Sequence, residues 1–212
     1  MVWCWFRGKS DQDKKLCIRS NSRTFCVLAV LLLASVVMLS ISPRGWSADY
    51  SEYEVKAAFL YKFVSFVEWP SQAEPEPSKP YLIGILGKDP FGNTIDDIVR
   101  QKSVRGHAIE IRRAEDETEL SDCHVLFIAA SEQSRFKDVL THFKGANILT
   151  VGESDDAAES GAVMSLYTIN GRVRFEVNID AAKAASLKIS SDLLDVAIVV
   201  EDDENAKEGN RG

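Results

Sequence analysis

Short apolar runs alternate with helical segments in the middle of the chain, and this order restricts the fold more than any other feature. The runs are YLIGIL (81–86), HVLFIAA (124–130) and NILTV (147–151), while HAIEIRR (107–113) alternates apolar and polar residues. Such runs are typical of strands in a largely buried sheet. Strands that alternate with helices favour a parallel sheet with helices on its faces. We therefore expect a single α/β domain with a mainly parallel sheet flanked by helices.

The pattern changes after Gly161. The stretch AVMSLYTINGRVRFEVN holds an Asn-Gly pair between two alternating runs, which predicts an antiparallel hairpin near the C-terminus. The stretches DAAKAA and SSDLLDVAIVV that follow are expected to form two closing helical segments around a short LKI run. The connection 114–123 is barely long enough for a parallel crossover, so the pairing of the strands on either side of it stays open.

The stretch EYEVKAAFLYKFVSFVEWP, residues 52–70, predicts a helix. Ser51 and Glu54 form the sequence of a capping box, and Lys56 and Lys62 are the charges of the helix interior. Two lysines are too few for a helix that lies on a membrane surface. Apolar side chains recur at helical spacing, at Val55, Phe59, Phe63, Phe66 and Val67. We expect a mostly buried helix, whose apolar face is wide enough to leave a docking role open.

Two further helices are predicted from their caps. Asp89 is expected to be the N-cap of a helix in GKDPFGNTIDDIVR, with Pro90 at the first helical position. Ser131 is expected to cap an amphipathic helix that carries Phe136, Val139, Leu140 and Phe143 on one face and ends at Gly145.

The N-terminal 48 residues have the layout of a secretory signal peptide. Residues 1–24 are basic, residues 25–41 carry no charge, and small residues follow at Ser47 and Ala48. The alternative is an uncleaved membrane anchor over 25–41. In either case the sequence predicts an exported domain over residues 49–200, followed by a disordered acidic tail over 201–212.

Without residues 1–48 the chain is strongly acidic and holds one cysteine. It keeps 18 basic and 30 acidic residues, a net charge of −12, which opposes binding to nucleic acid. Cys123 is the one cysteine after residue 48, so the exported domain has no intrachain disulfide.

No motif for catalysis is found in the sequence. The stretch GILGKDPFG (84–92) lacks the residues of a phosphate-binding loop, and no dinucleotide fingerprint or nucleophile motif is present. Cys123 and His124 are adjacent in a predicted strand and therefore point to opposite faces, which makes a shared metal site unfavourable. We predict no catalytic, cofactor-binding or metal residues. A small ligand at the carboxyl end of the first strand would lie within reach of Lys88, Asp89 and Phe91.

Several of these stretches together resemble the YfiR family of bacterial periplasmic proteins. They are EYEVKAAFLYKFVSFVEWP, YLIGILGKDPFG, CHVLFIAASE, ILTVGES and GRVRFEVNIDAAKAASLKISSDLL, and the resemblance runs from Tyr53 to Ala197. It implies a periplasmic, homodimeric repressor that contacts the periplasmic part of an inner-membrane diguanylate cyclase and holds it inactive. Loss of such a repressor raises cyclic di-GMP and biofilm formation. Redox-responsive members of the family have cysteine pairs, which the exported part of this chain lacks.

Two other partner classes stay open: a related sensor kinase, and a small molecule carried for a sensor or transporter. The residues that we expect at a partner or ligand surface are Glu68 and Trp69, at the end of the first predicted helix, and Lys88, Asp89 and Phe91 in the 88–91 loop.

Overall fold

The structure is a computed structural model, and it describes residues 51–200. The predicted export segment 1–48, its alternative anchor 25–41 and the predicted acidic tail 201–212 lie outside the described residues. Among the helices of residues 51–200, none has the length and apolar character needed to cross a membrane.

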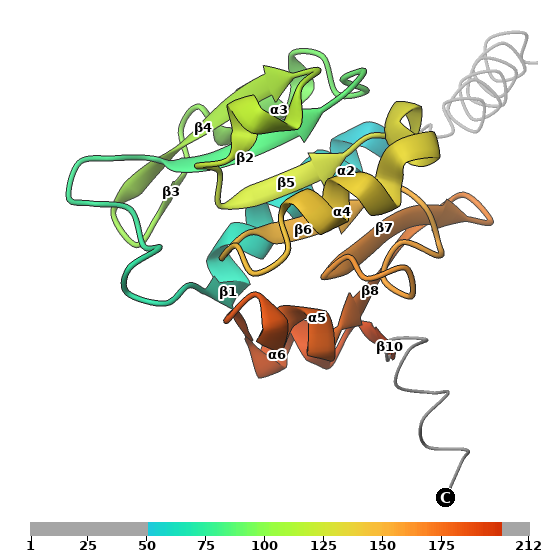
Figure 1. Cartoon of the computed structure of the whole chain (residues 1–212). Coiled ribbons are helices and arrows are strands. Elements are labelled where there is room, and N and C mark those ends of the chain that lie inside the picture. Colours follow the sequence, from blue (N-terminus) through green and yellow to red (C-terminus); the bar gives the residue numbers. More distant parts are fainter. Residues whose placement is uncertain (1–50, 201–212) are drawn as a thin grey trace, which may run out of the picture. The chain divides into compact units, whose positions relative to one another are not determined.

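The helices and strands alternate along the chain as Figure 1 shows. The helices are α2 (Glu52–Phe66), α3 (Thr94–Val99), α4 (Phe136–His142), α5 (Ile179–Ala184) and α6 (Ser191–Leu194), with 3-10 helices η1 (Glu117–Leu120) and η2 (Ala130–Arg135). The strands are β1 (Val67–Glu68), β2 (Tyr81–Leu86), β3 (Ser103–Val104), β4 (His107–Ala114), β5 (Val125–Ile128), β6 (Leu149–Gly152), β7 (Met164–Ile169), β8 (Arg172–Asn178), β9 (Lys188–Ile189) and β10 (Ile198–Val200).

The main sheet contains eight strands in the order β10-β8-β7-β6-β5-β2-β4-β3. Strands β4, β2, β5, β6 and the start of β7 pair in parallel, and β7 and β8 form an antiparallel hairpin. Asn170 and Gly171 both have positive φ at the hairpin turn, 52° and 70°, as a tight two-residue hairpin turn requires. The predicted α/β fold with a mainly parallel sheet and a C-terminal antiparallel hairpin is confirmed.

The connection 114–123 does not join two neighbouring strands. Strands β4 and β5 both pair with β2, one on each side of it. The connection therefore passes over one face of β2, and η1 places the buried Leu120 on that face, in one cluster with Leu126 and Cys123. The short crossover is possible because η1 itself packs on the sheet.

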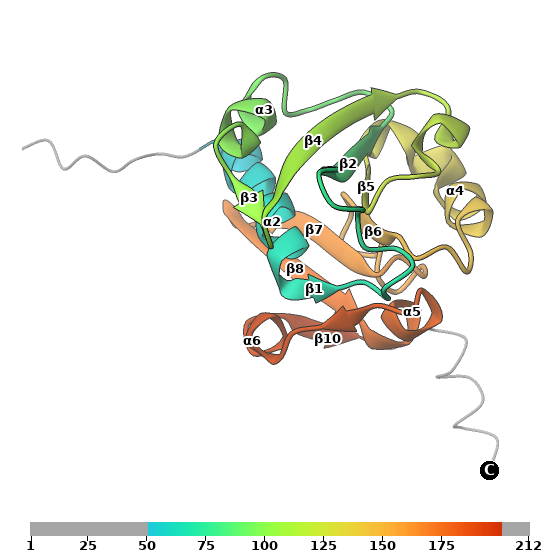
Figure 2. The ribbon, with the colours of Figure 1, turned by 90° about the vertical axis from the view of Figure 1, so that its left-hand side faces the viewer.

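Helices cover both faces of the sheet (Figure 2). On one face, α2 and α3 pack on the larger core cluster, which includes Phe63, Ile83 and Phe127. On the other face, α4 packs on a smaller cluster, which includes Leu126 and Phe136. The even-numbered side chains of β8 share this second face with Ser165 and Tyr167 of β7.

Helix α2 begins as predicted and ends earlier. The Ser51 hydroxyl accepts a hydrogen bond from Glu54 N, and Glu54 Oε2 accepts one from Ser51 N, so the capping box is formed. The helix ends at Phe66, because Val67 and Glu68 pair with β9. Leu60, Phe63 and Val64, which belong to the predicted wide apolar face, are buried together with Lys56 and Ala57. Val55, Phe59 and Phe66 were also expected on that face, but they are only half-buried.

Both predicted caps in the middle of the chain are wrong. Helix α3 begins at Thr94, and Asp89 instead accepts a hydrogen bond from Phe91 N at 2.7 Å and pairs with Arg113. The Ser131 hydroxyl accepts a hydrogen bond from Lys88 N at 2.9 Å and does not cap α4. Both side chains satisfy loop groups at the carboxyl edge of the sheet, because each helix begins several residues later.

The second closing helix is much shorter than predicted. Ser190 caps α6, which has four residues, and residues 198–200 then form β10, parallel to β8. Three successive β-branched residues, Ile198, Val199 and Val200, favour a strand over a helix.

Candidate docking site

The residues predicted at a partner surface lie at opposite edges of the sheet. Trp69 is 5 % exposed and packs against Tyr81 and His124, which stand at the amino ends of β2 and β5. Glu68 is exposed and lies opposite Lys188 in the β1–β9 ladder. Since Lys88 follows the carboxyl end of β2, it lies a strand length away from Trp69. The five residues therefore do not form one surface.

Of the three residues that were predicted at a surface in the 88–91 loop, Lys88, Asp89 and Phe91, only Lys88 is exposed. Phe91 is 4 % exposed and stacks edge-on against Phe127, with the ring centroids 4.9 Å apart. Asp89 is held by Arg113, whose guanidinium also pairs with Asp96 of α3. These two carboxylates raise the pKa of Arg113, Asp96 having the larger effect. Phe91 therefore belongs to the core, and Asp89 anchors the loop.

The crevice at the carboxyl ends of β2 and β5 is filled by the chain itself. This is where the strand order reverses direction, the usual ligand site of an open α/β sheet. A Cβ on Gly87 would lie 2.3 Å from Glu132 Oε1 and 2.5 Å from Ser131 Oγ. The start of η2 therefore rests on the backbone of Gly87 and leaves no room for a ligand at this point.

A buried ion pair lies next to this crevice. Lys56 Nζ is 3.0 Å from Glu153 Oε1 and 2.6 Å from Glu52 Oε1, and the side chains of Lys56 and Glu153 are 3 % and 6 % exposed. Glu153 Oε2 accepts a hydrogen bond from Ala130 N at 3.0 Å. One carboxylate thus ties the end of β6 to α2 and to the start of η2.

Tyr53 extends this network. Lys56 Nζ lies 5.0 Å from the centre of the Tyr53 ring, which also contacts Phe91 edge-on. Burial, and after it the neighbouring Glu153 carboxylate, raises the pKa of Tyr53 to about 12. The sequence showed Lys56 as a charge in the helix interior, but its partner Glu153 comes 97 residues later and was not predicted.

Cys123 and His124 have separate structural environments. Cys123 is 4 % exposed, and burial raises the pKa of its thiol to about 12, which disfavours the reactive thiolate. His124 Nδ1 accepts a hydrogen bond from Leu82 N at 3.0 Å, and burial lowers the pKa of the imidazole. No group of three His, Cys, Asp or Glu side chains suited to a metal ion occurs within residues 51–200.

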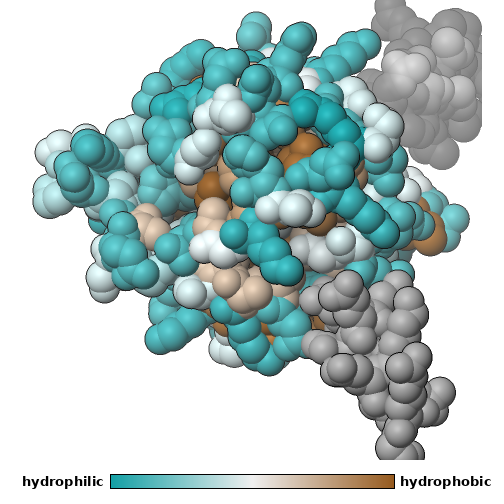
Figure 3. Space-filling model, in the orientation of Figure 1, coloured by the Kyte–Doolittle hydropathy of each residue, from teal (hydrophilic) through white to brown (hydrophobic). Residues whose placement is uncertain are grey.

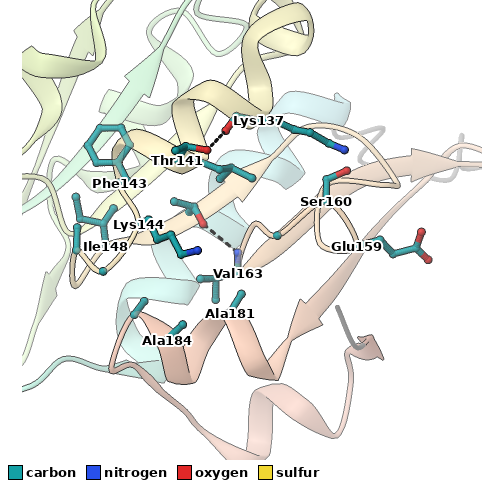
Figure 4. A pocket seen from close by; sticks show the side chains of 16 residues that line it. Lys137, Thr141, Phe143, Lys144, Ile148, Glu159, Ser160, Val163, Ala181 and Ala184 are labelled. Atoms are coloured by element: carbon teal, nitrogen blue, oxygen red, sulfur yellow. Dashed lines mark hydrogen bonds between the residues drawn. The ribbon is translucent and has the colours of Figure 1, made fainter. Parts of the chain in front are cut away.

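A cavity of about 500 Å³ lies between α4 and α5, and we name it the α4–α5 groove (Figure 4). Its lining includes Ile148, which precedes β6, Thr150 of β6, and Val163. The Thr150 hydroxyl accepts a hydrogen bond from Val163 N at 2.9 Å. Its apolar walls are formed by Leu140, Phe143, Ala181, Ala184 and Ala185. Small alanines on α5 leave this space open.

The charged residues that line the groove are two lysines and one glutamate, Glu159. Lys144 extends across the cavity toward Val163, and Lys137 lies at its opening (Figure 4). Neither lysine makes an ion pair within the described part of the chain. The molecular surface on this side is mostly hydrophilic, with apolar surface visible in its central part (Figure 3). Because two lysines stand against one glutamate, the groove suits an apolar segment or molecule that also carries a negative charge placed near Lys144.

One family model and two solved structures are similar to this chain. A family model described as YfiR/HmsC-like matches residues 53–198. A crystal structure of a conserved domain protein from Vibrio cholerae O1 biovar El Tor is 12 % identical, with a TM-score of 0.47, over 69 % of this chain and 59 % of that one. An ABC domain from Streptococcus pneumoniae, solved in complex with L-Trp, is 12 % identical, with a TM-score of 0.41, over 57 % of this chain and 55 % of that one. The chain thus spans less than two thirds of both solved chains, and neither likeness carries a functional argument.

Proposed function

Because the chain belongs to the YfiR/HmsC-like family, we propose that it is a periplasmic regulatory protein that represses an inner-membrane diguanylate cyclase. In this proposal it binds the periplasmic portion of the cyclase, holds the enzyme inactive, and so lowers cyclic di-GMP and biofilm formation. The observation that carries the proposal is the family match, which spans residues 53–198 and thus nearly the whole described domain.

The structure supports a binding role over a catalytic one. The carboxyl edge of the sheet is filled by residues that pair with one another, among them Lys56, Asp89, Arg113 and Glu153. The α4–α5 groove instead leaves apolar walls and two lysines free for a partner. We take this groove as the docking site for a segment of the cyclase with apolar side chains flanked by acidic ones.

Repression by binding requires a difference in affinity between two states of the cyclase. A protein that binds both states equally does not change the equilibrium between them. To shift the ratio of the two states from 1:99 to 99:1, it must bind the favoured state about 10⁴-fold more tightly. The groove must therefore recognise a surface that the cyclase presents in its inactive state.

The function is tested by deleting the gene and measuring cyclic di-GMP in the cells. The proposal expects a rise that the full-length gene reverses. It also expects the exported chain, recovered from the periplasm, to retain a membrane protein with a cyclase domain, identified by mass spectrometry. If cyclic di-GMP did not change and a sensor kinase were recovered, the kinase would be the target in place of the cyclase.

The size and charge of the groove also favour a second function, the binding of a small molecule for a sensor or transporter. A cavity of about 500 Å³ is in the range of small-molecule sites, and Lys144 would pair with an anionic group on an apolar ligand. Native mass spectrometry of the exported chain distinguishes the two functions. A retained small molecule, together with no membrane partner, would favour the second.

A further inference from the structure

The connection between β6 and β7 differs from the other parallel connections because it carries no helix. Strands β6 and β7 pair in parallel, so the chain crosses one face of the sheet between them. In α/β folds such a crossover usually contains an α-helix that covers that face. Here residues 153–163 form only turns and bends, whereas α3 lies between β2 and β4 and α4 between β5 and β6. The crossover from β6 to β7 therefore leaves its face of the sheet without a helix.

The α4–α5 groove lies on this face. Ile148 belongs to the smaller core cluster under α4, and Thr150, two residues along, points to the same face of the sheet. Both residues line the groove, together with Gly161 of the connection between β6 and β7. The connection packs on the smaller cluster through two small side chains, Ala157 and Ala162. The groove is therefore space that the helix-free connection leaves open beside α4.

Backbone groups of the residues that line the groove are already used. Val163 donates its N–H to the Thr150 hydroxyl, and its carbonyl accepts a hydrogen bond from Asn178 N, both at 2.9 Å. On the α5 side, the Ala185 carbonyl accepts a hydrogen bond from Asn147 Nδ2 at 2.9 Å. Strand β6 itself lies inside the sheet, between β5 and β7. An extended segment in the groove would therefore bury N–H and C=O groups without partners, whereas an α-helix pairs these groups within itself.

The side chains of the groove match one face of an amphipathic helix. Such a helix presents apolar side chains at i, i+3, i+4 and i+7, and a hydrophobic groove between two helices accepts them. The apolar walls of the groove come from α4 and α5. Lys137 and Lys144 stand against one glutamate, Glu159, so an acidic side chain beside the apolar face of the helix would find a cation at Lys144.

We propose that the α4–α5 groove binds an amphipathic α-helix of the partner, which lies against β6 where a crossover helix would otherwise pack. Apolar side chains at helical spacing fill the groove, and an acidic side chain beside them pairs with Lys144. The inference rests on the proposed function, because it specifies the conformation of the cyclase segment that the groove binds. It excludes an extended strand at this position.

The test is photo-crosslinking in living cells that express the full-length gene. The photoreactive residue p-benzoylphenylalanine takes the place of Thr141 on the α4 wall or of Ala184 on the α5 wall, both of which are exposed. In the control it takes the place of Lys88, which is exposed at the carboxyl edge. Mass spectrometry identifies the partner residues that each position reaches. We expect crosslinks from both groove positions to partner residues spaced three or four apart, and none from Lys88.

The spacing of the crosslinks separates this inference from the proposed function. A spacing of two residues, as in an extended segment, would overturn the inference, and so would the absence of crosslinks from both groove positions. The proposed function is judged by whether the crosslinked protein has a cyclase domain. Helical spacing on a protein without one would retain the helix in the groove and reject the cyclase as the target.

Two tryptophan variants test whether the groove itself is occupied. Ala184→Trp places a large ring in the groove and should reduce the crosslink from Thr141 at least tenfold. Lys183→Trp is the matched control, because Lys183 is the exposed neighbour on α5 and does not line the groove. It should leave the crosslink unchanged, and circular dichroism should show both variants folded. An undiminished crosslink in Ala184→Trp would overturn the inference.

Discussion

The carboxyl edge of the sheet and the α4–α5 groove differ in how their charged groups are paired. At the carboxyl edge, Lys56 pairs with Glu153, and Arg113 pairs with Asp89. In the groove, Lys144 has no ion-pair partner among residues 51–200 and extends into open space (Figure 4). The edge where α/β sheets usually bind ligands is here occupied by ion pairs that hold the elements together. Lys88 at the carboxyl edge also makes no ion pair within residues 51–200, but Lys144 lies in a groove with apolar walls, on a helix-covered face of the sheet.

The largest expected effect comes from breaking the buried ion pair. Lys56→Met would leave Glu153 buried without its cation and should cost about 3–5 kcal/mol of unfolding free energy. Lys62→Met, at an exposed lysine of the same helix, is the control and should change stability by less than about 0.5 kcal/mol. Urea unfolding measures both. Equal effects of the two variants would show that the pair does not stabilise the carboxyl edge.

A smaller effect is expected from overpacking the end of β6. A Cβ at Gly152 would lie 2.4 Å from Ala157 Cβ and 2.8 Å from Phe136 Cζ. Gly152→Ala should therefore lower the unfolding free energy by about 1–3 kcal/mol. Gly84→Ala is a milder comparison, because its nearest contact would be Leu120 Cδ2 at 3.2 Å. If Gly84→Ala were the more damaging substitution, the close packing described at Gly152 would be wrong.

The carboxyl edge should also respond to alkaline pH. The pKa of Tyr53 is raised to about 12 in the folded chain, compared with about 10 in an unfolded one. The unfolded state therefore loses this proton first, so the stability from Tyr53 is complete below about pH 10 and is lost as the pH rises through about 12. Tyr53→Phe should lose less stability than wild type over this interval. If the unfolding free energies of wild type and Tyr53→Phe depended on pH in the same way, the burial of the Tyr53 hydroxyl would be contradicted.

The smallest effect on stability is expected in the groove. Lys144→Glu reverses an exposed charge without an ion-pair partner in the described chain, so the unfolding free energy should change by less than about 0.5 kcal/mol. A large destabilisation would show that Lys144 supports the fold, and the contrast between the two regions would then disappear.

Local signals in the sequence were sufficient for much of the fold. The capping box at Ser51 and Glu54 and the Asn170-Gly171 turn depend on residues close in sequence, and both are formed. Strand β10 was missed because a run of three β-branched residues is too short to separate a strand from the end of a helix by periodicity.

The site could not be predicted in the same way. Glu153 pairs with Lys56 across 97 residues, and the α4–α5 groove combines side chains from α4, the β6 segment and α5. Trp69 and Phe91 were expected at a surface, yet both are buried, because aromatic residues at the ends of a helix or strand pack into the core as readily as they face a partner. Such contacts depend on tertiary packing, which cannot be predicted from the spacing of apolar residues along the chain.

The most direct test of the account is the affinity of the chain for the periplasmic portion of the recovered membrane cyclase, measured by isothermal titration calorimetry. Three proteins are compared: wild type, Lys144→Glu in the groove, and Lys88→Glu at the carboxyl edge, where Lys88 is also exposed. The account predicts at least tenfold weaker binding for Lys144→Glu and wild-type affinity for Lys88→Glu. Weaker binding for Lys88→Glu, with Lys144→Glu unchanged, would contradict it and place the partner at the carboxyl edge.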